Sequence, residues 1–152
     1  MIAYGSGMDT PLGIDGLLAR AREGLRRLEP RQAAHAVRQG AVLIDTRPEF
    51  QRRAEGEIPG AIVVERNHLE WRLDPASGAR IPEAVDRDVA WIIICDEGYS
   101  SSLAAASLKS LGLPNATDVI GGFQAWRDAG LPVAALGSPK TVREHGSGPS
   151  GR

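Results

Sequence analysis

The sequence contains a single cysteine, Cys95, among its 152 residues, which excludes an internal disulfide. Lysine is almost absent as well: Lys109 and Lys140 are the only two, so arginine supplies nearly all of the positive charge. Acidic and basic residues nearly balance, and the formal net charge is -1. This balance excludes an overall electrostatic attraction to nucleic acid or to an anionic membrane surface.

Long hydrophobic runs are also missing, since no stretch approaches the roughly 20 apolar residues that cross a bilayer. The first ten residues, MIAYGSGMDT, lack the basic start and the apolar centre of a secretory signal peptide. With 42% hydrophobic and 24% charged residues, the composition is that of an ordinary globular domain. We therefore expect a cytoplasmic protein whose only thiol stays reduced.

Histidine is too sparse to predict a metal site. His35, His68 and His145 have neither the spacing nor the neighbouring ligands that such a site requires. No histidine and aspartate pair is evident that would activate a serine nucleophile. The sequence thus predicts no metal and no cofactor.

Composition and periodicity divide the chain into four parts. Residues 1–13 contain Gly, Ser and Pro without a period and are expected to form a flexible arm. Residues 14–29 are predicted to form an extra N-terminal helix, and residues 30–136 the folded domain. Residues 137–152 are rich in Gly, Ser, Pro and charge, which is typical of a disordered tail.

The predicted N-terminal helix is amphipathic. Its apolar face repeats every three or four positions and consists of Leu17, Leu18, Ala21, Leu25 and Leu28. The opposite face carries Arg20, Glu23 and Arg27, and we expect it to lie in solvent. The sequence leaves open whether this helix packs on its own domain or on a second copy in a homodimer.

Within the predicted domain, short apolar runs alternate with helical segments. The strand-like runs are AVLID (41–45), AIVVE (61–65), WIIIC (91–95) and TDVI (117–120). Helices are predicted over 30–39, 48–56, 100–111 and 121–130, with loops and a short helical turn over 67–90. WIIIC is apolar at every position, as in a parallel strand that is buried on both faces. The alternation predicts an α/β domain with a mostly parallel sheet flanked by helices.

Two interpretations of Cys95 are consistent with its neighbours. It ends a predicted parallel strand, at the edge where ligands bind in such sheets. The next helix begins a few residues later, and its N-terminus stabilises anions. Gly98 would let the loop curl so that successive backbone N–H groups converge. The alternative is an inert core thiol, because free cysteines are among the most buried residues.

Four segments in order resemble the rhodanese-like (sulfurtransferase) domain family, over roughly residues 30–134. LIDTRPEFQ is similar to the family's Asp-x-Arg segment. EGEIPGAIVV is similar to its Gly-His-Ile-Pro-Gly-Ala segment, with Glu57 where His is usual. IICDEGYSSS resembles its six-residue active loop, and VIGGFQAWRDAGLPV resembles its closing signature of two glycines, Trp and Gly-Leu-Pro.

The resemblance implies a single rhodanese-like domain with a five-stranded, mostly parallel sheet. It also implies a sulfurtransferase that moves sulfane sulfur from thiosulfate or a persulfide to an acceptor such as cyanide or a thiol. Cys95 would carry the sulfur as a persulfide. The rest of the loop would surround it and bind the substrate: Asp96, Glu97, Gly98, Tyr99, Ser100 and Ser101.

The loop departs from many active members of the family because it contains neither Arg nor Lys. Asp96 and Glu97 disfavour a neighbouring thiolate and repel an anionic donor. We therefore expect weak use of thiosulfate, and a donor that is less anionic or is a protein persulfide. The serines at positions 100–102 are expected to cap the following helix.

Two arginines are candidates for binding an anionic donor. Arg47 follows the strand that ends at Asp45, and Arg66 follows the strand 61–65, so both are predicted near the ligand-binding edge of the sheet. The alternative for Arg47 is a structural ion pair with Asp45 or Glu49. The alternative for Arg66 is a solvent-exposed side chain.

Two other functions are alternatives to sulfur transfer. The domain would also suit a non-enzymatic persulfide relay or a regulatory binding module, and the acidic loop favours this interpretation. A phosphatase on the same fold requires Cys-x5-Arg, and Ser101 stands where that pattern needs Arg. The predicted partners are a small-molecule sulfur donor or a protein persulfide donor, with no nucleic acid and no membrane.

Overall fold

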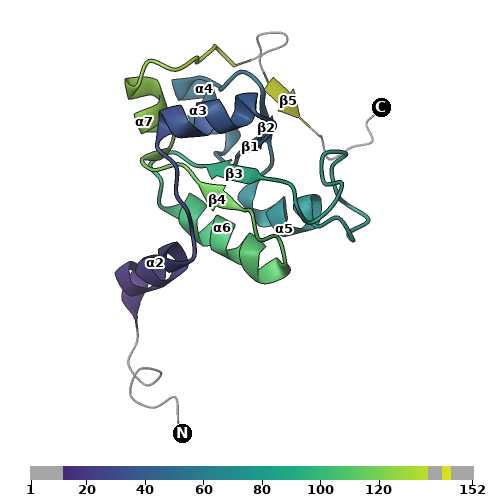
Figure 1. The fold of residues 1–152 in the computed structure, drawn as a ribbon. Coiled ribbons are helices and arrows are strands. Elements are labelled where there is room, and N and C mark those ends of the chain that lie inside the picture. The colour runs from purple at the N-terminus through teal and green to yellow at the C-terminus, as the bar shows by residue number, and fades with distance from the viewer. Residues whose placement is uncertain (1–11, 137–141, 145–152) are drawn as a thin grey trace, which may run out of the picture.

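The computed structural model describes residues 12–136 and 142–144, and a parallel sheet lies at its centre (Figure 1). The strands are β1 (Val42–Asp45), β2 (Ala61–Val63), β3 (Trp91–Ile94), β4 (Thr117–Asp118) and β5 (Val142–Glu144). Their order is β4-β3-β1-β2-β5, and all neighbouring strands are parallel. The predicted α/β class with a mostly parallel sheet is confirmed.

Residues 30–136 contribute four of these strands, whereas five were expected from this domain. The fifth strand, β5, comes from residues 142–144 of the predicted disordered tail and pairs with the free edge of β2. An edge strand offers unpaired backbone groups, and this favours such an addition. At the opposite edge the described residues form a single parallel bridge, between Leu28 and Val119. Positions 1–11, 137–141 and 145–152 of the predicted arm and tail lie outside the described residues.

Helices cover both faces of the sheet. They are α2 (Gly13–Glu23), α3 (Pro30–Arg38), α4 (Glu49–Glu55), α5 (Leu69–Leu73), α6 (Ser100–Leu111) and α7 (Gly122–Asp128), with the 3₁₀ helix η1 (Arg66–His68) before α5. Figure 1 shows α3 and α7 on one face and α5 and α6 on the other. None of the helices within the described ranges is long and apolar enough to span a membrane.

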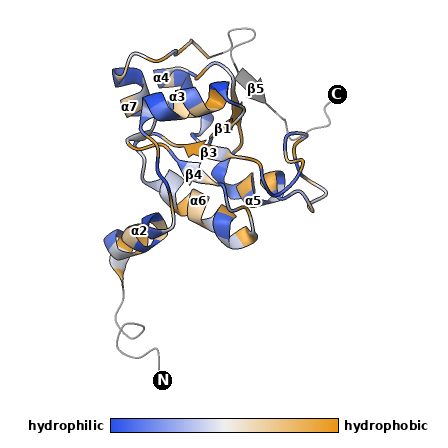
Figure 2. Cartoon of the chain, in the orientation of Figure 1, coloured by the Kyte–Doolittle hydropathy of each residue, from blue (hydrophilic) through white to orange (hydrophobic). Residues whose placement is uncertain are grey.

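Two hydrophobic cores form because side chains of a strand alternate between the faces of a sheet. Ile93 of β3 packs toward α5 and α6, in a core with Leu73 and Leu108. Ile92 and Ile94 pack toward α3 and α7, and the second core includes Phe123. Figure 2 shows hydrophobic residues in β3 at the centre of the sheet, with helices around it in which hydrophilic and hydrophobic residues alternate.

The N-terminal helix α2 is shorter than the predicted helix 14–29. It ends at Glu23, and Gly24 follows as the C-cap. Leu18 is its one buried side chain among the described residues, and the helix packs against α6 of its own domain. The following residues leave the helix and reach β4, where Leu28 donates its N–H to the Asp118 carbonyl at 3.0 Å.

Candidate functional site

Cys95 lies directly after β3, at the carboxyl edge of the sheet, as predicted. Its side chain is buried, and Sγ accepts hydrogen bonds from the backbone N–H groups of Gly98 at 3.2 Å and Ser101 at 3.3 Å. Ser101 belongs to the first turn of α6, a helix of 12 residues whose N-terminus carries a partial positive charge. A sulfur in this setting is stabilised as an anion. The geometry favours a nucleophile over an inert core thiol.

The Cys95 loop borders a pocket of about 360 Å³. The described residues that line it come from the connection between β1 and α4 and from the loop itself: Thr46, Arg47, Pro48, Gln51, Cys95, Asp96, Glu97, Tyr99 and Ser100. Asp96 and Glu97 bring two carboxylates to this lining, and Arg47 is its only guanidinium among the described residues. The charge state of the pocket therefore depends on whether Arg47 is free.

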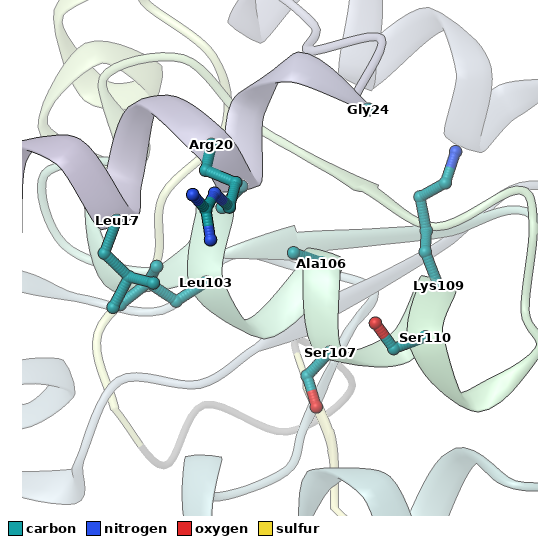
Figure 3. Close-up of a pocket in the computed structure, with 9 residues that line it drawn as sticks. Leu17, Arg20, Gly24, Leu103, Ala106, Ser107, Lys109 and Ser110 are labelled. Atoms are coloured by element: carbon teal, nitrogen blue, oxygen red, sulfur yellow. The ribbon is translucent and has the colours of Figure 1, made fainter. Parts of the chain in front are cut away.

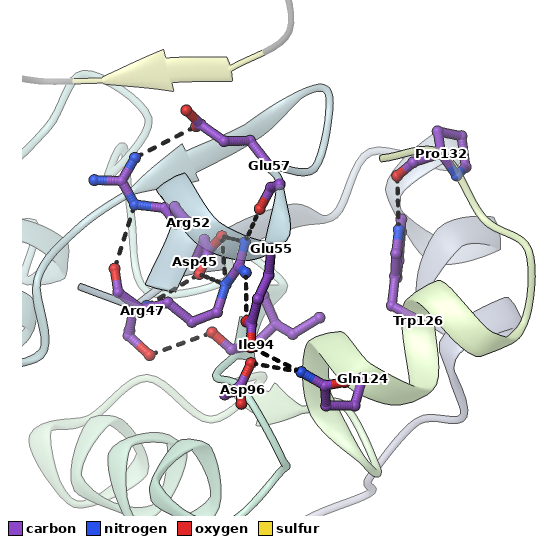
Figure 4. A network of polar contacts seen from close by, with 12 residues as sticks. Asp45, Arg47, Arg52, Glu55, Glu57, Ile94, Asp96, Gln124, Trp126 and Pro132 are labelled. Atoms are coloured by element: carbon purple, nitrogen blue, oxygen red, sulfur yellow. Dashed lines mark hydrogen bonds and ion pairs between the residues drawn. The ribbon is translucent and has the colours of Figure 1, made fainter. Parts of the chain in front are cut away.

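The Arg47 guanidinium is bound by other protein groups (Figure 4). Its Nη2 donates to Asp45 Oδ2 at 2.8 Å and to the Gly56 carbonyl at 2.9 Å, and its Nη1 lies 3.4 Å from Glu55 Oε1. The guanidinium carbon also lies 3.8 Å from the centroid of the Phe123 ring. The structural ion pair with Asp45 is thus confirmed, and Arg47 lines the pocket without offering an unpaired charge.

Arg66 does not line this pocket, contrary to the prediction. It lies in η1, and its Nη1 donates to both carboxylate oxygens of Glu70, at 3.1 and 3.0 Å. Glu70 also accepts a hydrogen bond from the Ser107 hydroxyl of α6. Burial raises the pKa of Glu70, but the hydrogen bonds from Ser107 and Arg66 outweigh it and hold that pKa below its ordinary value. Arg66 therefore connects η1 with α5 and, through Glu70, with α6.

An amide links Asp96, which lines the pocket, to the carboxyl group of Glu55, which lies outside the pocket lining. Gln124 Nε2 donates to Asp96 Oδ1 and to Glu55 Oε2, each at 3.1 Å (Figure 4). A hydrogen bond with Asp96, followed by burial and by repulsion from the same carboxylate, raises the pKa of Glu55, while Arg47 opposes the change. Asp96 is thus held in place beside a second carboxyl group, and Glu97 remains exposed.

The glycine turn before α7 supports the loop from one side. The N–H of Phe123 donates to the Cys95 carbonyl at 2.8 Å, and the N–H of Gln124 donates to the Asp96 carbonyl at 3.0 Å. Because peptide units are trans, the N–H ends of those units point away from α7. Gly122 has φ +61°, and a Cβ there would lie 2.6 Å from the Cys95 carbonyl oxygen. Only glycine permits this close approach.

Residues of the N-terminal segment support the loop from another side. The Gly98 carbonyl accepts hydrogen bonds from Arg22 Nη2 at 2.8 Å and from Arg27 Nη2 at 3.0 Å. Arg27 Nε also pairs with Asp118 Oδ1 at 2.9 Å, and Asp118 is fully buried at the end of β4. The prediction of a solvent-exposed Arg27 is wrong, because α2 ends at Glu23 and Arg27 lies on the extended segment beyond it.

The serines of α6 contribute to this second support. The hydroxyls of Ser101 and Ser102 each donate to Asp118 Oδ2 at 2.7 Å. No side-chain cap is present at the start of α6, so the predicted capping role is wrong. Asp118 was missed from the sequence. No signal in the sequence placed it at this site, because the predicted strand 117–120 puts Asp118 near its start, whereas β4 ends at Asp118.

Comparisons with known proteins agree with this geometry. A family model described as the rhodanese-like domain matches residues 29–129. The thiosulfate sulfurtransferase GlpE of Pseudomonas entomophila is 35% identical over 102 residues, 67% of this chain and 84% of that protein. GlpE of Pseudomonas fluorescens is 34% identical over 115 residues, 76% of this chain and 96% of that protein.

One similar solved structure comes from Rhodopseudomonas palustris and is described as a protein of unknown function and a possible tyrosine phosphatase. It is 32% identical, with a TM-score of 0.72, and the match covers 80% of this chain and 93% of that chain. The family match begins at residue 29, so α2 and both arginines that bind the Gly98 carbonyl precede it.

Proposed function

We infer that this chain, which belongs to the rhodanese-like domain family, is a rhodanese-type sulfurtransferase that carries sulfane sulfur on Cys95. The observation that carries the inference is the pair of backbone N–H groups, from Gly98 and Ser101, that bind Sγ. These donors favour the thiolate that attacks a sulfur donor, and they also favour the anionic persulfide that results.

The reaction consists of two displacements at sulfur. The Cys95 thiolate attacks the sulfane sulfur of the donor, and the donor's bond to that sulfur breaks with its electron pair leaving on sulfite or a thiolate. An acceptor such as cyanide or a thiolate then attacks the outer sulfur of the Cys95 persulfide. The S–S bond breaks, and its electron pair returns to Cys95 as the thiolate. The two steps balance without an added oxidant or reductant.

The charges of the pocket favour a donor that is less anionic than thiosulfate. Asp96 and Glu97 line the pocket, and the Arg47 guanidinium beside them is already paired with Asp45 and Glu55. A thiosulfate dianion therefore meets net repulsion at the entrance. The sulfur group of a persulfide, on a small thiol or on a partner protein, carries one negative charge at most, whereas thiosulfate carries two. We propose such a persulfide as the preferred donor.

Phosphate hydrolysis is the weaker candidate, although the Rhodopseudomonas palustris neighbour is described as a possible tyrosine phosphatase. Ser101 stands six residues after Cys95, where the phosphatase pattern has its arginine, and its hydroxyl donates to Asp118. The described lining residues of the pocket supply no unpaired guanidinium that would hold phosphate oxygens in bidentate fashion.

The experiment is an intact-mass measurement of the purified protein after incubation with thiosulfate or with glutathione persulfide. We expect a gain of one sulfur atom that cyanide removes and that Cys95→Ser lacks. We expect the gain to form faster with the persulfide. The variant Asp96→Asn/Glu97→Gln keeps the size of both side chains, and removing two negative charges should speed loading from thiosulfate by roughly fivefold. Added salt should narrow that difference.

Three outcomes separate the alternatives. If neither small donor loads Cys95 but a persulfidated partner protein does, the chain is a relay rather than an enzyme for small donors. If no donor loads it, sulfur transfer is excluded and a binding module becomes the better description. Release of phosphate from a phosphotyrosine analogue, absent in Cys95→Ser, would instead establish the phosphatase.

A further inference from the structure

We propose that Arg22 and Arg27 are positioning residues of the Cys95 loop, supplied from outside the family domain, and that they replace the basic residue that the loop itself lacks. The proposal concerns the same site and rests on the proposed sulfurtransferase function. It rests on the fact that two guanidiniums, from separate parts of the N-terminal segment, bind the same loop carbonyl, that of Gly98.

Arg22 connects α2 with the wall of the pocket. Its Nη2 donates to the Gly98 carbonyl at 2.8 Å, and its Nε donates to the Ser102 hydroxyl at 3.0 Å. Its guanidinium carbon also lies 5.9 Å from the centroid of the Tyr99 ring, and Tyr99 lines the pocket. One side chain of α2 therefore fixes a loop carbonyl, a helix residue and an aromatic side chain at the entrance.

Arg27 connects the same carbonyl with the end of β4. Its guanidinium binds both carboxylate oxygens of Asp118, at 2.9 and 3.2 Å, and its Nη2 also reaches the Gly98 carbonyl at 3.0 Å. The Arg27 side chain is 16% exposed and the Asp118 side chain is 0% exposed, so solvent screens this pair little.

The position of the Gly98 carbonyl determines where the neighbouring N–H groups point. In a trans peptide unit the carbonyl and the following N–H lie on opposite sides, so two donors on the Gly98 oxygen direct the N–H of Tyr99 away from the arginines. The N–H of Gly98 itself already binds Sγ. Cationic donors also polarise the peptide unit more strongly than neutral ones.

The charge of this arrangement opposes that of the pocket entrance. Two guanidiniums and one carboxylate leave a net positive charge behind the loop, whereas Asp96 and Glu97 place negative charge in front of it. The positive charge lies where it stabilises an anionic sulfur without contacting the donor. A basic residue within the loop would stabilise the anionic sulfur and would also contact an anionic donor. Separating the two effects leaves Cys95 activated in a pocket that disfavours anionic donors.

Apolar packing alone holds α2 only loosely. A pocket of about 480 Å³ lies between α2 and α6, and Figure 3 shows Leu17 of α2 reaching toward Leu103 of α6 at one end of it. Leu18 is the single buried residue of the helix. The polar contacts of Arg22 with the loop and with Ser102 therefore make up a large part of what keeps α2 in place.

The test measures the rate at which iodoacetamide alkylates Cys95 as a function of pH, which requires no sulfur donor. The variants are Arg22→Gln and the double change Arg27→Gln/Asp118→Asn, which removes the buried pair together and leaves no unpaired charge. We expect the pH profile of Arg22→Gln to move to higher pH and its alkylation at neutral pH to slow by up to about tenfold, because one positive charge is lost. The double change removes one charge of each sign, so a smaller move in the same direction reports the loss of the Arg27 donor to the Gly98 carbonyl. Arg22→Lys should bring the pH profile most of the way back to that of the wild type, because it returns the positive charge at position 22.

The matched control is Arg26→Gln. Arg26 is exposed, lies in the same segment and carries the same charge, so its loss should leave the pH profile unchanged. A circular dichroism spectrum and a urea titration of each variant verify folding. The proposal is overturned if the folded Arg22→Gln variant and the folded double variant keep the wild-type midpoint, or if Arg26→Gln shifts it equally. Because wild-type sulfur loading is measured separately, either claim can fail while the other stands.

Discussion

The Cys95 loop is held by two supports that differ in chemistry. The N-terminal support consists of Arg22, Arg27 and Asp118, and it binds the Gly98 carbonyl with cationic donors. The α7 support is the turn at 121–124, which binds the Cys95 and Asp96 carbonyls with neutral backbone N–H groups. Both orient carbonyls away from Sγ, but only the N-terminal support adds charge.

The difference indicates that geometry and electrostatics are supplied by different parts of the chain. The α7 support lies within the family match of residues 29–129. The N-terminal support depends on Arg22 and Arg27, which precede that match. Damage to the α7 support should therefore distort the loop, whereas damage to the N-terminal support should change its charge and its anchoring.

The largest effect is expected from Gly122→Ala in the α7 support. The new Cβ would lie 2.6 Å from the Cys95 carbonyl oxygen and 2.7 Å from the Asp96 carbonyl, so the loop backbone must shift. Displacing the N–H donors of Sγ by about 1 Å should slow sulfur loading by roughly 100-fold. Strain and overpacking should also lower the free energy of unfolding by about 3 kcal/mol. Loading rates from intact mass, with a urea titration, measure both effects.

Gly130→Ala is the matched control for that change. Gly130 has φ +77°, close to the positive φ of Gly122, but a Cβ there would meet nothing within 4 Å. This variant should lose about 1 kcal/mol from backbone strain alone and load sulfur at the wild-type rate. If both variants slow loading equally, close packing against the Cys95 loop is not what the Gly-Gly turn provides.

Asp118→Asn should have the next largest effect, and it acts on the N-terminal support. The carboxylate is fully buried and accepts hydrogen bonds from Arg27, Ser101 and Ser102. Removing its charge leaves the Arg27 guanidinium without its partner, which should cost about 3 kcal/mol and lower Tm by roughly 10 °C. Thermal unfolding followed by circular dichroism gives the value.

The double variant Arg27→Gln/Asp118→Asn provides the control for that cost. Because it removes both charges, it should be more stable than Asp118→Asn alone, and comparison with both single variants gives the coupling between the two side chains. A coupling energy near zero would show that Arg27 and Asp118 contribute independently to the free energy of unfolding. Their ion pair would then not stabilise the N-terminal support.

The α7 support was largely predictable from the sequence, and the N-terminal support was not. Gly121 and Gly122 can be read from the sequence, and the segment VIGGFQAW resembles a family signature, so the helix predicted over 121–130 lies where α7 is found. WIIIC likewise indicated burial on both faces through its composition alone. Features of this kind depend on residues that are adjacent in the chain, so the sequence alone predicts them.

Contacts between distant segments have no such signature. Arg27 and Asp118 are 91 positions apart, and Arg22 and Gly98 are 76 apart. The helical periodicity that correctly predicted α2 also extended it past its true end, and this placed Arg27 on a solvent-exposed face. α2 ends at Glu23 with Gly24 as its C-cap, and the chain then pairs Leu28 with Val119 in a tertiary bridge that helical periodicity does not register.

Glu55→Gln should have the smallest effect, and it acts on the carboxyl group that Gln124 links to Asp96. The hydrogen bond with Asp96, burial and repulsion raise the pKa of Glu55 in the folded state, so the folded protein holds this proton more tightly than the unfolded chain. The resulting stability is fully present below the ordinary glutamate pKa and is lost as pH rises through the raised pKa. The glutamine amide has no proton to lose in this range, so the variant should gain stability over wild type as pH rises from the ordinary glutamate pKa through the raised pKa of Glu55. Urea midpoints at each pH, with Glu49→Gln of the same helix as control, measure this difference in stability.

Two results would contradict the prediction: a stability difference between Glu55→Gln and wild type that does not change with pH, or an equal change in Glu49→Gln. Either result would mean that Asp96 and Glu55 do not interact electrostatically, and that the repulsion of anionic donors comes from Asp96 and Glu97 alone.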